Sequence, residues 1–73
     1  MGTRNPALFD LVAVLSPPRD AELEVGDVGT VVELLPPDGV EVEFLYRDGH
    51  TRTLATFPIS DVLVLNRDRT QVA

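Results

Sequence analysis

The only histidine of the chain, His50, follows Asp48 and Gly49 directly, and a carboxylate beside an imidazole is a pair that general acid–base catalysis uses. Asp-Gly is also a strong signal for a hairpin turn, which would place both side chains at a solvated tip. Nothing in the spacing brings Ser16 or Ser60 to His50, so a Ser–His–Asp arrangement is not expected. We therefore expect His50 to be a solvated turn residue and the protein not to be an enzyme.

Closely spaced acids, which could suggest a calcium loop, are found at Asp20, Glu22, Glu24 and Asp27. They lack the glycine and the final glutamate at the spacing of an EF-hand, so a solvated acidic loop is expected. Gly26 and Gly29 lie next to a strand with no helix after them, which argues against a phosphate cradle. Because there is also no cysteine for a zinc site, we expect neither a metal nor another cofactor.

Charge narrows the class of partner. Twelve Asp and Glu residues outnumber six Arg, there is no Lys, and the formal net charge is −6. Nucleic-acid affinity rests largely on neutralising phosphates, so this charge disfavours nucleic acid as a partner. The acidity either serves solubility or suits a basic protein partner. No apolar run reaches the roughly 18 residues of a membrane span and no signal-peptide pattern opens the chain, so we expect a cytoplasmic protein without a membrane partner.

The sequence predicts that the candidate residues are positioned by short strands and the loops between them. Residues 8–15 are nearly all apolar and β-rich, which favours a strand buried on most of its surface, and two prolines end it. A polar loop over residues 19–24 follows, and Leu23 is its expected anchor in the core.

The rest of the predicted fold is built around the stretch from Glu24 to Glu33. This stretch is predicted to be a turn that leads into a strand over residues 27–35. Gly26 can take the positive φ of a tight turn, and Asp27 can hydrogen-bond the backbone just beyond it. Gly29 lies inside a β-branched run, where a glycine marks a bulge, a bend or a close backbone approach.

Pro36-Pro37-Asp38-Gly39 predicts a hairpin, and residues 37–39 suit a three-residue loop with glycine in the left-handed position. The cross-strand pairs that follow are Leu34–Val42, Val32–Phe44 and Glu33–Glu43. One face then collects apolar residues and the other collects acids, as a half-buried sheet requires.

Residues 40–46 alternate apolar and polar, and Asp48-Gly49 predicts a second hairpin with a two-residue type I′ turn. Its predicted pairs are Arg47–His50, Tyr46–Thr51, Leu45–Arg52 and Phe44–Thr53. A fourth strand ends at Phe57-Pro58, a short turn covers residues 59–61, and a closing strand covers residues 62–65.

These elements predict one all-β domain, a small five-stranded SH3-like barrel over residues 8–65. Its signs are short strands, a long first loop and a short turn before the last strand. Residues 1–7 and 66–73 are expected to be flexible tails. No repeat, helical period or low-complexity tract competes with this interpretation.

The order of the motifs resembles DUF4926, a family of small bacterial proteins described as a domain of unknown function, over roughly Leu8 to Leu65. The residues that carry the resemblance are Asp10 and Val12, Gly26-Asp27-Val28-Gly29-Thr30-Val31-Val32-Glu33, Val42-Glu43-Phe44, Asp48-Gly49 and Ser60-Asp61-Val62. The resemblance implies a stand-alone, non-catalytic protein that accompanies a neighbouring gene's product, in the manner of an antitoxin or immunity protein. It assigns no role to any single residue.

The predicted register collects one candidate binding face on the outside of the barrel: Val31, Glu33, Leu35, Glu41, Glu43, Leu45, Arg52 and Leu54. Apolar residues rimmed by charges are typical of interaction surfaces, unless barrel curvature, the long loop or a tail covers them. We therefore predict a non-catalytic protein-binding module whose partner carries a basic rim. The alternative function is a KOW-type module of a ribonucleoprotein or transcription complex, and the alternative interface is the loop over residues 19–27. The oligomeric state is left open.

Overall fold

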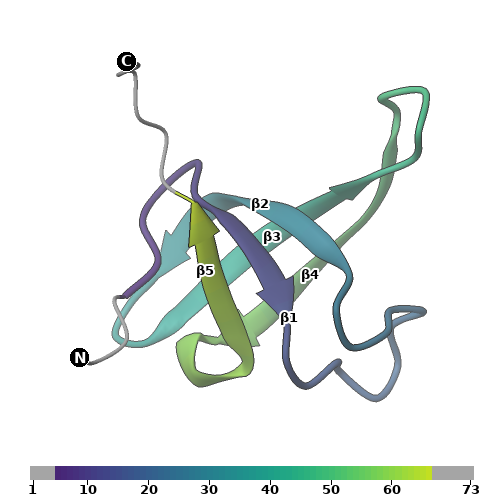
Figure 1. Cartoon of the computed structure of the whole chain (residues 1–73). Helices are drawn as coiled ribbons and strands as arrows, with labels where there is room; N and C mark the ends of the chain where they lie inside the picture. Colours follow the sequence, from purple (N-terminus) through teal and green to yellow (C-terminus); the bar gives the residue numbers. More distant parts are fainter. Residues whose placement is uncertain (1–4, 67–73) are drawn as a thin grey trace.

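The computed structural model describes residues 5–66, which form five strands and one short 3-10 helix (Figure 1). The elements are β1 (Leu11–Val14), β2 (Val28–Leu35), β3 (Gly39–Leu45), β4 (Thr51–Pro58), η1 (Ile59–Asp61) and β5 (Val62–Asn66). Residues 1–4 and 67–73, the larger part of each predicted tail, lie outside the described residues. The predicted all-β class is confirmed.

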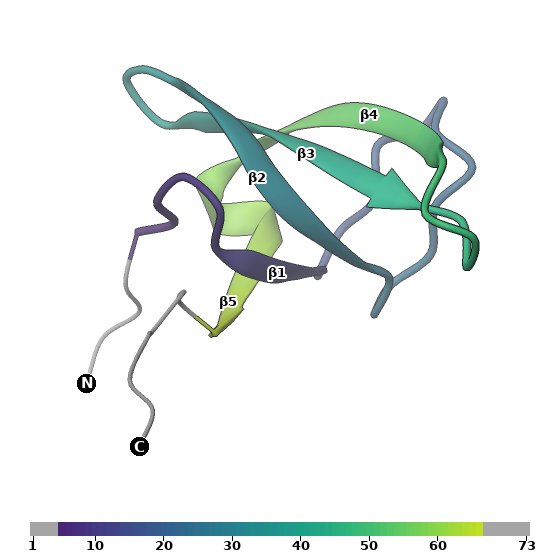
Figure 2. The ribbon, with the colours of Figure 1, turned by 90° about the horizontal axis from the view of Figure 1, so that it is seen from above.

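The strands form one antiparallel sheet in the order β4-β3-β2-β1-β5. The long strand β2 belongs to both halves of this sheet, because its first residues pair with β1 and the rest pair with β3. Figure 2 shows the β1–β5 half lying across the β3–β4 half. Strands β4 and β5 follow each other through η1 but stand at opposite ends of the order. The sheet therefore curls into the predicted SH3-like shape without closing.

Gly29 lies where β2 passes from one partner strand to the other. A Cβ atom on this residue would stand 2.6 Å from Val42 Cγ1, 2.7 Å from the carbonyl oxygen of Glu43 and 2.9 Å from Phe44 Cδ2. These separations are shorter than carbon atoms tolerate, so no side chain fits between β2 and β3 here. The close backbone approach that the sequence predicted is thus one cause of the sharp curl.

The turn before β2 has the predicted glycine, at φ 94° in Gly26. The Gly26 amide donates to the carbonyl of Val14 at 2.8 Å, which ties the turn to the end of β1. The Asp27 carboxylate accepts a hydrogen bond from the Glu24 amide at 2.9 Å. The sequence had suggested that Asp27 would hydrogen-bond the backbone beyond it. Its carboxylate instead bonds the backbone three residues earlier and closes the turn.

The β2–β3 hairpin has a three-residue loop, but this loop spans residues 36–38 and not residues 37–39. Leu35 pairs with Gly39, so the register is shifted by two relative to the prediction. Glu33 consequently faces Glu41, and the predicted pair of Glu33 with Glu43 is wrong.

A β-bulge in β2 adds a second correction. Val32 is the extra residue between the pairs Glu33–Glu41 and Val31–Val42, and it reverses the alternation of side chains along the strand. Val31 consequently points into the core with no exposed surface, whereas the sequence placed it on the outer face. Val32 therefore does not pair with Phe44 as predicted, whereas the predicted pair Leu34–Val42 is wrong because of the shifted loop, which pairs Leu34 with Val40.

The β3–β4 hairpin is also wider than predicted. Tyr46 accepts a hydrogen bond from the Gly49 amide and donates one to the carbonyl of His50, both at 2.9 Å, so three residues separate Tyr46 from His50. A type I′ turn needs positive φ at both central residues, yet Asp48 does not have it and only Gly49 does, at 94°. The turn is therefore a three-residue loop that ends on a left-handed glycine.

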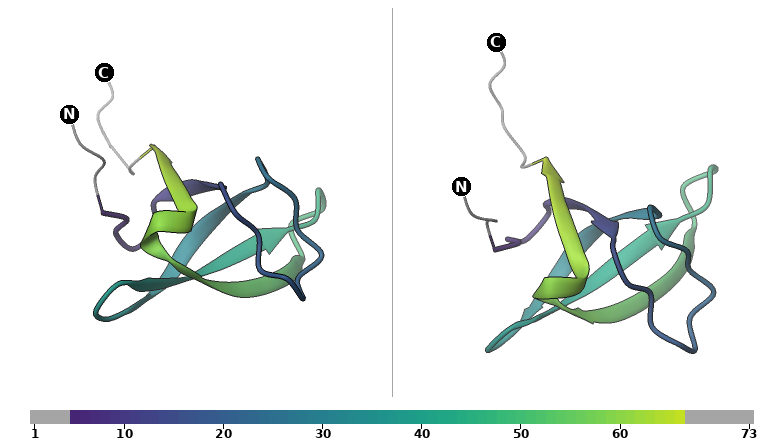
Figure 3. Two further views of the ribbon diagram at one scale, coloured as in Figure 1. Left: turned by 90° about the horizontal axis from the view of Figure 1, so that it is seen from below. Right: turned by 60° about the horizontal axis from the view of Figure 1, so that its bottom comes forward.

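Arg52 is the extra residue of a bulge in β4. The pairs on either side are Leu45–Thr51 and Phe44–Thr53, of which the second was predicted. The displaced Arg52 reaches the β1–β2 loop, where Nη2 donates to the Glu22 carbonyl at 2.7 Å and Nη1 lies 3.7 Å from Asp27 Oδ2. Figure 3 shows this loop beside β4. Arg52 thus binds the loop and does not pair with Leu45.

The hydrophobic core fills the inside of the curl. Its buried members are Val12, Val14, Leu23, Val31, Val40, Val42, Phe44, Phe57 and Val62. The rings of Phe44 and Phe57 lie 6.1 Å apart at 60°, a favourable tilted arrangement. Leu23 is the loop anchor that the sequence predicted.

The chain before β1 is fixed by a buried carboxylate. Asp10 is 2% exposed, and its Oδ2 accepts a hydrogen bond from the Ala7 amide at 2.8 Å. Phe9, between them, donates its amide to the Val31 carbonyl at 2.7 Å. Its φ of 71° is rare for a bulky residue and turns the aromatic ring outward, 64% exposed.

Candidate protein-binding face

The outer surface of β3, β4 and the end of β2 carries leucines among carboxylates. We term it the acid half, and its members are Glu33, Glu41, Glu43, Leu45 and Leu54. Strand alternation sets their direction, because the intervening residues of β3 are buried in the core. The register then places Glu33 opposite Glu41, and Glu43 opposite Leu54.

The acid half can bind a protein surface without any chemical step. Leu45 and Leu54 are 52% and 51% exposed, so each has apolar area left to bury against a partner. Glu33 and Glu41 adjoin across the strands, and the neighbour of Glu41 on β4 is the uncharged Thr56. Glu43 accepts a hydrogen bond from the Thr51 hydroxyl at 2.6 Å, which holds the carboxylate on this face. The carboxylates would attract cationic side chains around an apolar centre.

Two of the predicted face residues are not part of this surface. Val31 is in the core because of the β2 bulge, and Arg52 lies against the β1–β2 loop because of the β4 bulge. The acid half therefore has no cation of its own among the residues predicted for it.

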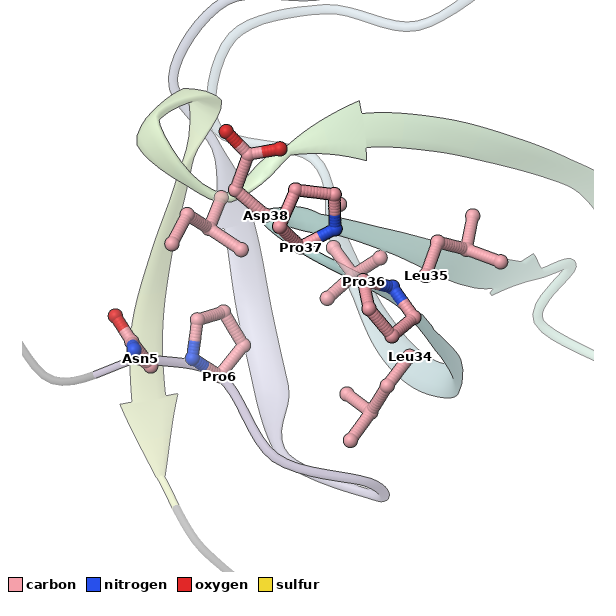
Figure 4. A pocket seen from close by; sticks show the side chains of 10 residues that line it. Asn5, Pro6, Leu34, Leu35, Pro36, Pro37 and Asp38 are labelled. Atoms are coloured by element: carbon pink, nitrogen blue, oxygen red, sulfur yellow. The ribbon is translucent and has the colours of Figure 1, made fainter.

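The remaining predicted residue, Leu35, is half-buried at the end of β2 and lines a pocket of about 170 Å³. Figure 4 shows the pocket between the β2–β3 turn and the segment before β1, where Pro6, Pro36 and Leu34 come together. Ile59 of η1 closes another side, and its amide donates to the Asp38 carbonyl at 2.8 Å. Pockets for small molecules usually hold 300 Å³ or more. This one has room for about one apolar side chain.

A second exposed surface was not predicted. It covers the outer side of β1, β5 and the start of β2, and we term it the uncharged half: Leu11, Ala13, Val28, Thr30, Leu63 and Leu65. The register makes it continuous, because Ala13 lies between Val28 and Leu63, and Leu11 lies beside Thr30. Leu63 and Leu65 are 42% and 49% exposed. Continuous apolar surfaces are common places for protein contacts.

The sequence does hold a signal for the uncharged half. The strand segments Leu11–Val14 and Val62–Leu65 are apolar at every position, on both faces of the sheet. A sheet with one solvated face shows alternation, whereas continuous apolar strands are typical of sheets covered on both sides. The first and last strands also pair with each other, which the SH3-like order implies.

The residues considered for catalysis are solvated. The His50 amide donates to Asp48 Oδ1 at 3.0 Å, and His50 Nδ1 lies 3.1 Å from Oδ2. These hydrogen bonds, that of the backbone first, lower the pKa of Asp48 below its ordinary value. Both side chains are mostly exposed at the hairpin tip, away from the residues that line the pocket. Within residues 5–66, no three His, Asp or Glu side chains gather closely enough to hold a metal ion.

No helix in the described part of the chain is long and apolar enough to cross a membrane. Comparison with curated proteins and with solved structures gives no match. A family model does match, over residues 8–64, which include nearly all of the folded sheet. The chain therefore belongs to the family described as Domain of unknown function (DUF4926), as its motifs had indicated.

Proposed function

We propose that the protein is a cytoplasmic, non-catalytic module that binds another protein through the acid half. The observation that carries this proposal is the exposure of Leu45 and Leu54 on a face where the other members are glutamates. For an isolated sheet, adjoining carboxylates are unfavourable, and exposed apolar groups rimmed by charges are typical of interaction surfaces. Both features favour binding when a partner covers them.

The partner that fits this face presents arginines or lysines around an apolar centre. The carboxylates would mainly steer association and set orientation, because charged groups at a rim act on the association rate more than on affinity. The two leucines would supply most of the burial, at about 25 cal/mol per Å² of apolar area. We further propose that the partner is the product of a neighbouring gene, with this protein as its antitoxin-like or immunity-like companion.

Co-purification of tagged protein with the products of the adjacent genes tests the proposal. We expect a stoichiometric complex with the wild type and loss of that complex with Leu45→Asp or Leu54→Asp. Val25→Asp is the matched control, because Val25 is an exposed apolar residue of the β1–β2 turn. Circular dichroism checks that every variant is folded.

Glu43→Lys adds a kinetic readout. We expect slower association with the partner, most visibly at low salt, where charges are least screened. Full binding by folded Leu45→Asp and Leu54→Asp variants would contradict the proposal and move the interface elsewhere, first to the loop between Arg19 and Asp27.

A further inference from the structure

The two halves of the outer sheet surface differ sharply in charge. The acid half contains Glu33, Glu41 and Glu43, whereas no member of the uncharged half is ionisable. Eleven of the acids and three of the arginines lie in residues 5–66, which gives this part of the chain a formal net charge of −8. The uncharged half is therefore an apolar area on a strongly negative domain.

This partition decides which occupant suits the uncharged half. A basic partner would find no carboxylate among its members and would be drawn to the acid half instead. Two copies of the chain cannot meet through their acid halves, because carboxylates would then oppose carboxylates. They can meet through their uncharged halves, whose members are apolar side chains and Thr30, with Glu43 beside Thr30 at the edge of the surface.

We infer that the uncharged half packs against the same surface of a second copy, across a two-fold axis. Such an interface uses one patch twice, as most homodimers do, and it stacks two sheets about 10 Å apart. The row Val28–Ala13–Leu63 supplies its centre, with Leu11 and Leu65 beside it. The acid half of each copy stays open, so a dimer would offer two identical sites to the partner proposed above.

The charge also fixes how the dimer responds to salt. Each copy carries the same strong negative charge, so long-range repulsion opposes association at low ionic strength. Salt screens this repulsion and strengthens apolar contact, and the dimer should tighten as salt is added. Binding of a basic partner to the acid half should weaken over the same range. The two predicted interactions are thus distinguished by opposite salt dependence.

Sedimentation equilibrium of the full chain, from micromolar to millimolar concentration and at low and high salt, tests the inference. We expect a wild-type dimer that tightens with salt, and a Leu63→Glu variant whose dissociation constant rises at least tenfold. Leu54→Glu is the matched control, the same change at a leucine of the acid half that is 51% exposed against 42% for Leu63, and it should dimerise like the wild type. Should Leu63→Glu fail to fold by circular dichroism, Leu65→Glu replaces it.

Three results would overturn the inference. They are a wild-type monomer at millimolar concentration in high salt, an unweakened dimer of the folded Leu63→Glu or Leu65→Glu variant, and equal weakening by Leu54→Glu. The first two results do not bear on the partner proposal, because that proposal depends on the acid half and is tested by a different complex. The third would place Leu54 of the acid half in the contact between copies and would count against both proposals.

Discussion

At the scale of single residues, Gly29 is the position on which the curl of the sheet most directly depends. Its φ is not in the left-handed region, so glycine is needed here for space and not for backbone conformation. Two of the three atoms that a Cβ would meet belong to core side chains, and the third is the Glu43 carbonyl oxygen in the β3 backbone. A backbone atom cannot move aside as the end of a side chain can.

Replacing Gly29 with valine should therefore destabilise the domain by about 1–3 kcal/mol, through overpacking between β2 and β3. Urea denaturation measures the change, and Thr30→Val serves as the control because it adds a β-branched apolar residue one position along, on the outer face. An unchanged midpoint for Gly29→Val would show that β2 and β3 are not closely apposed at this point.

Asp48 supplies a pH-dependent prediction at the β3–β4 turn. Its pKa is lowered in the folded protein by hydrogen bonds from His50, so ionised Asp48 favours folding. This contribution is complete above the unfolded pKa of about 3.9 and disappears as pH falls through the lower, folded value. Asp48→Asn should consequently have a lower melting temperature than the wild type at neutral pH, and the difference should shrink as pH falls below the unfolded pKa and vanish below the folded one. A difference that grows on acidification would contradict the assignment.

At the scale of elements, strand patterns in the sequence predict the strands themselves but not their register. The elements and their order follow from apolar runs, prolines and glycine turns. The predicted start of the first strand is wrong, because Leu8 and Phe9 form an exposed turn and β1 begins only at Leu11. The register was not predicted correctly, because Val32 and Arg52 each add one residue to one strand of a pair. A bulge leaves the amino-acid composition of a strand unchanged, and the alternation of apolar and polar residues does not show where the extra residue lies.

The candidate site depended on the same bulges. Glu41, Glu43, Leu45 and Leu54 could be predicted because β3 and most of β4 alternate regularly. The inward direction of Val31 could not be predicted, because it is set by the bulge at Val32. Nothing in the sequence distinguishes Val32 from its neighbour Val31 as the extra residue. The uncharged half could have been predicted from strands that are apolar on both faces, had their pairing with each other been considered.

The corrected register makes its own prediction for β2 and β3. Glu33 and Glu41 are cross-strand neighbours, and their repulsion costs a few tenths of a kcal/mol, up to about 1. Glu33→Arg should thus raise the free energy of unfolding by about that amount. Asp20→Arg, in the β1–β2 loop, makes the same change in net charge and is the control. Equal stabilisation by both variants would attribute the effect to net charge and not to the pair.

At the scale of the whole molecule, the curled sheet separates two kinds of surface that share β2. Figure 2 shows how the strands of one half cross those of the other, and the two surfaces adjoin where Thr30 pairs with Glu43. A protein of this shape can hold a second copy on one side and a basic partner on the other. Mutations away from the Thr30–Glu43 pair, such as those at Leu54 in β4 and Leu63 in β5, should act independently, as is usual for sites without shared contacts.

The most direct test of protein binding by the acid half is methyl cross-saturation in the complex with the neighbouring gene's product. Leucine methyl signals of this chain are recorded while the protons of the partner are saturated, so that only methyl groups at the interface lose intensity. Binding through the acid half would attenuate the signals of Leu45 and Leu54 and leave those of Leu63 and Leu65 unaffected. Full intensity at Leu45 and Leu54, with attenuation confined to other leucines, would contradict it.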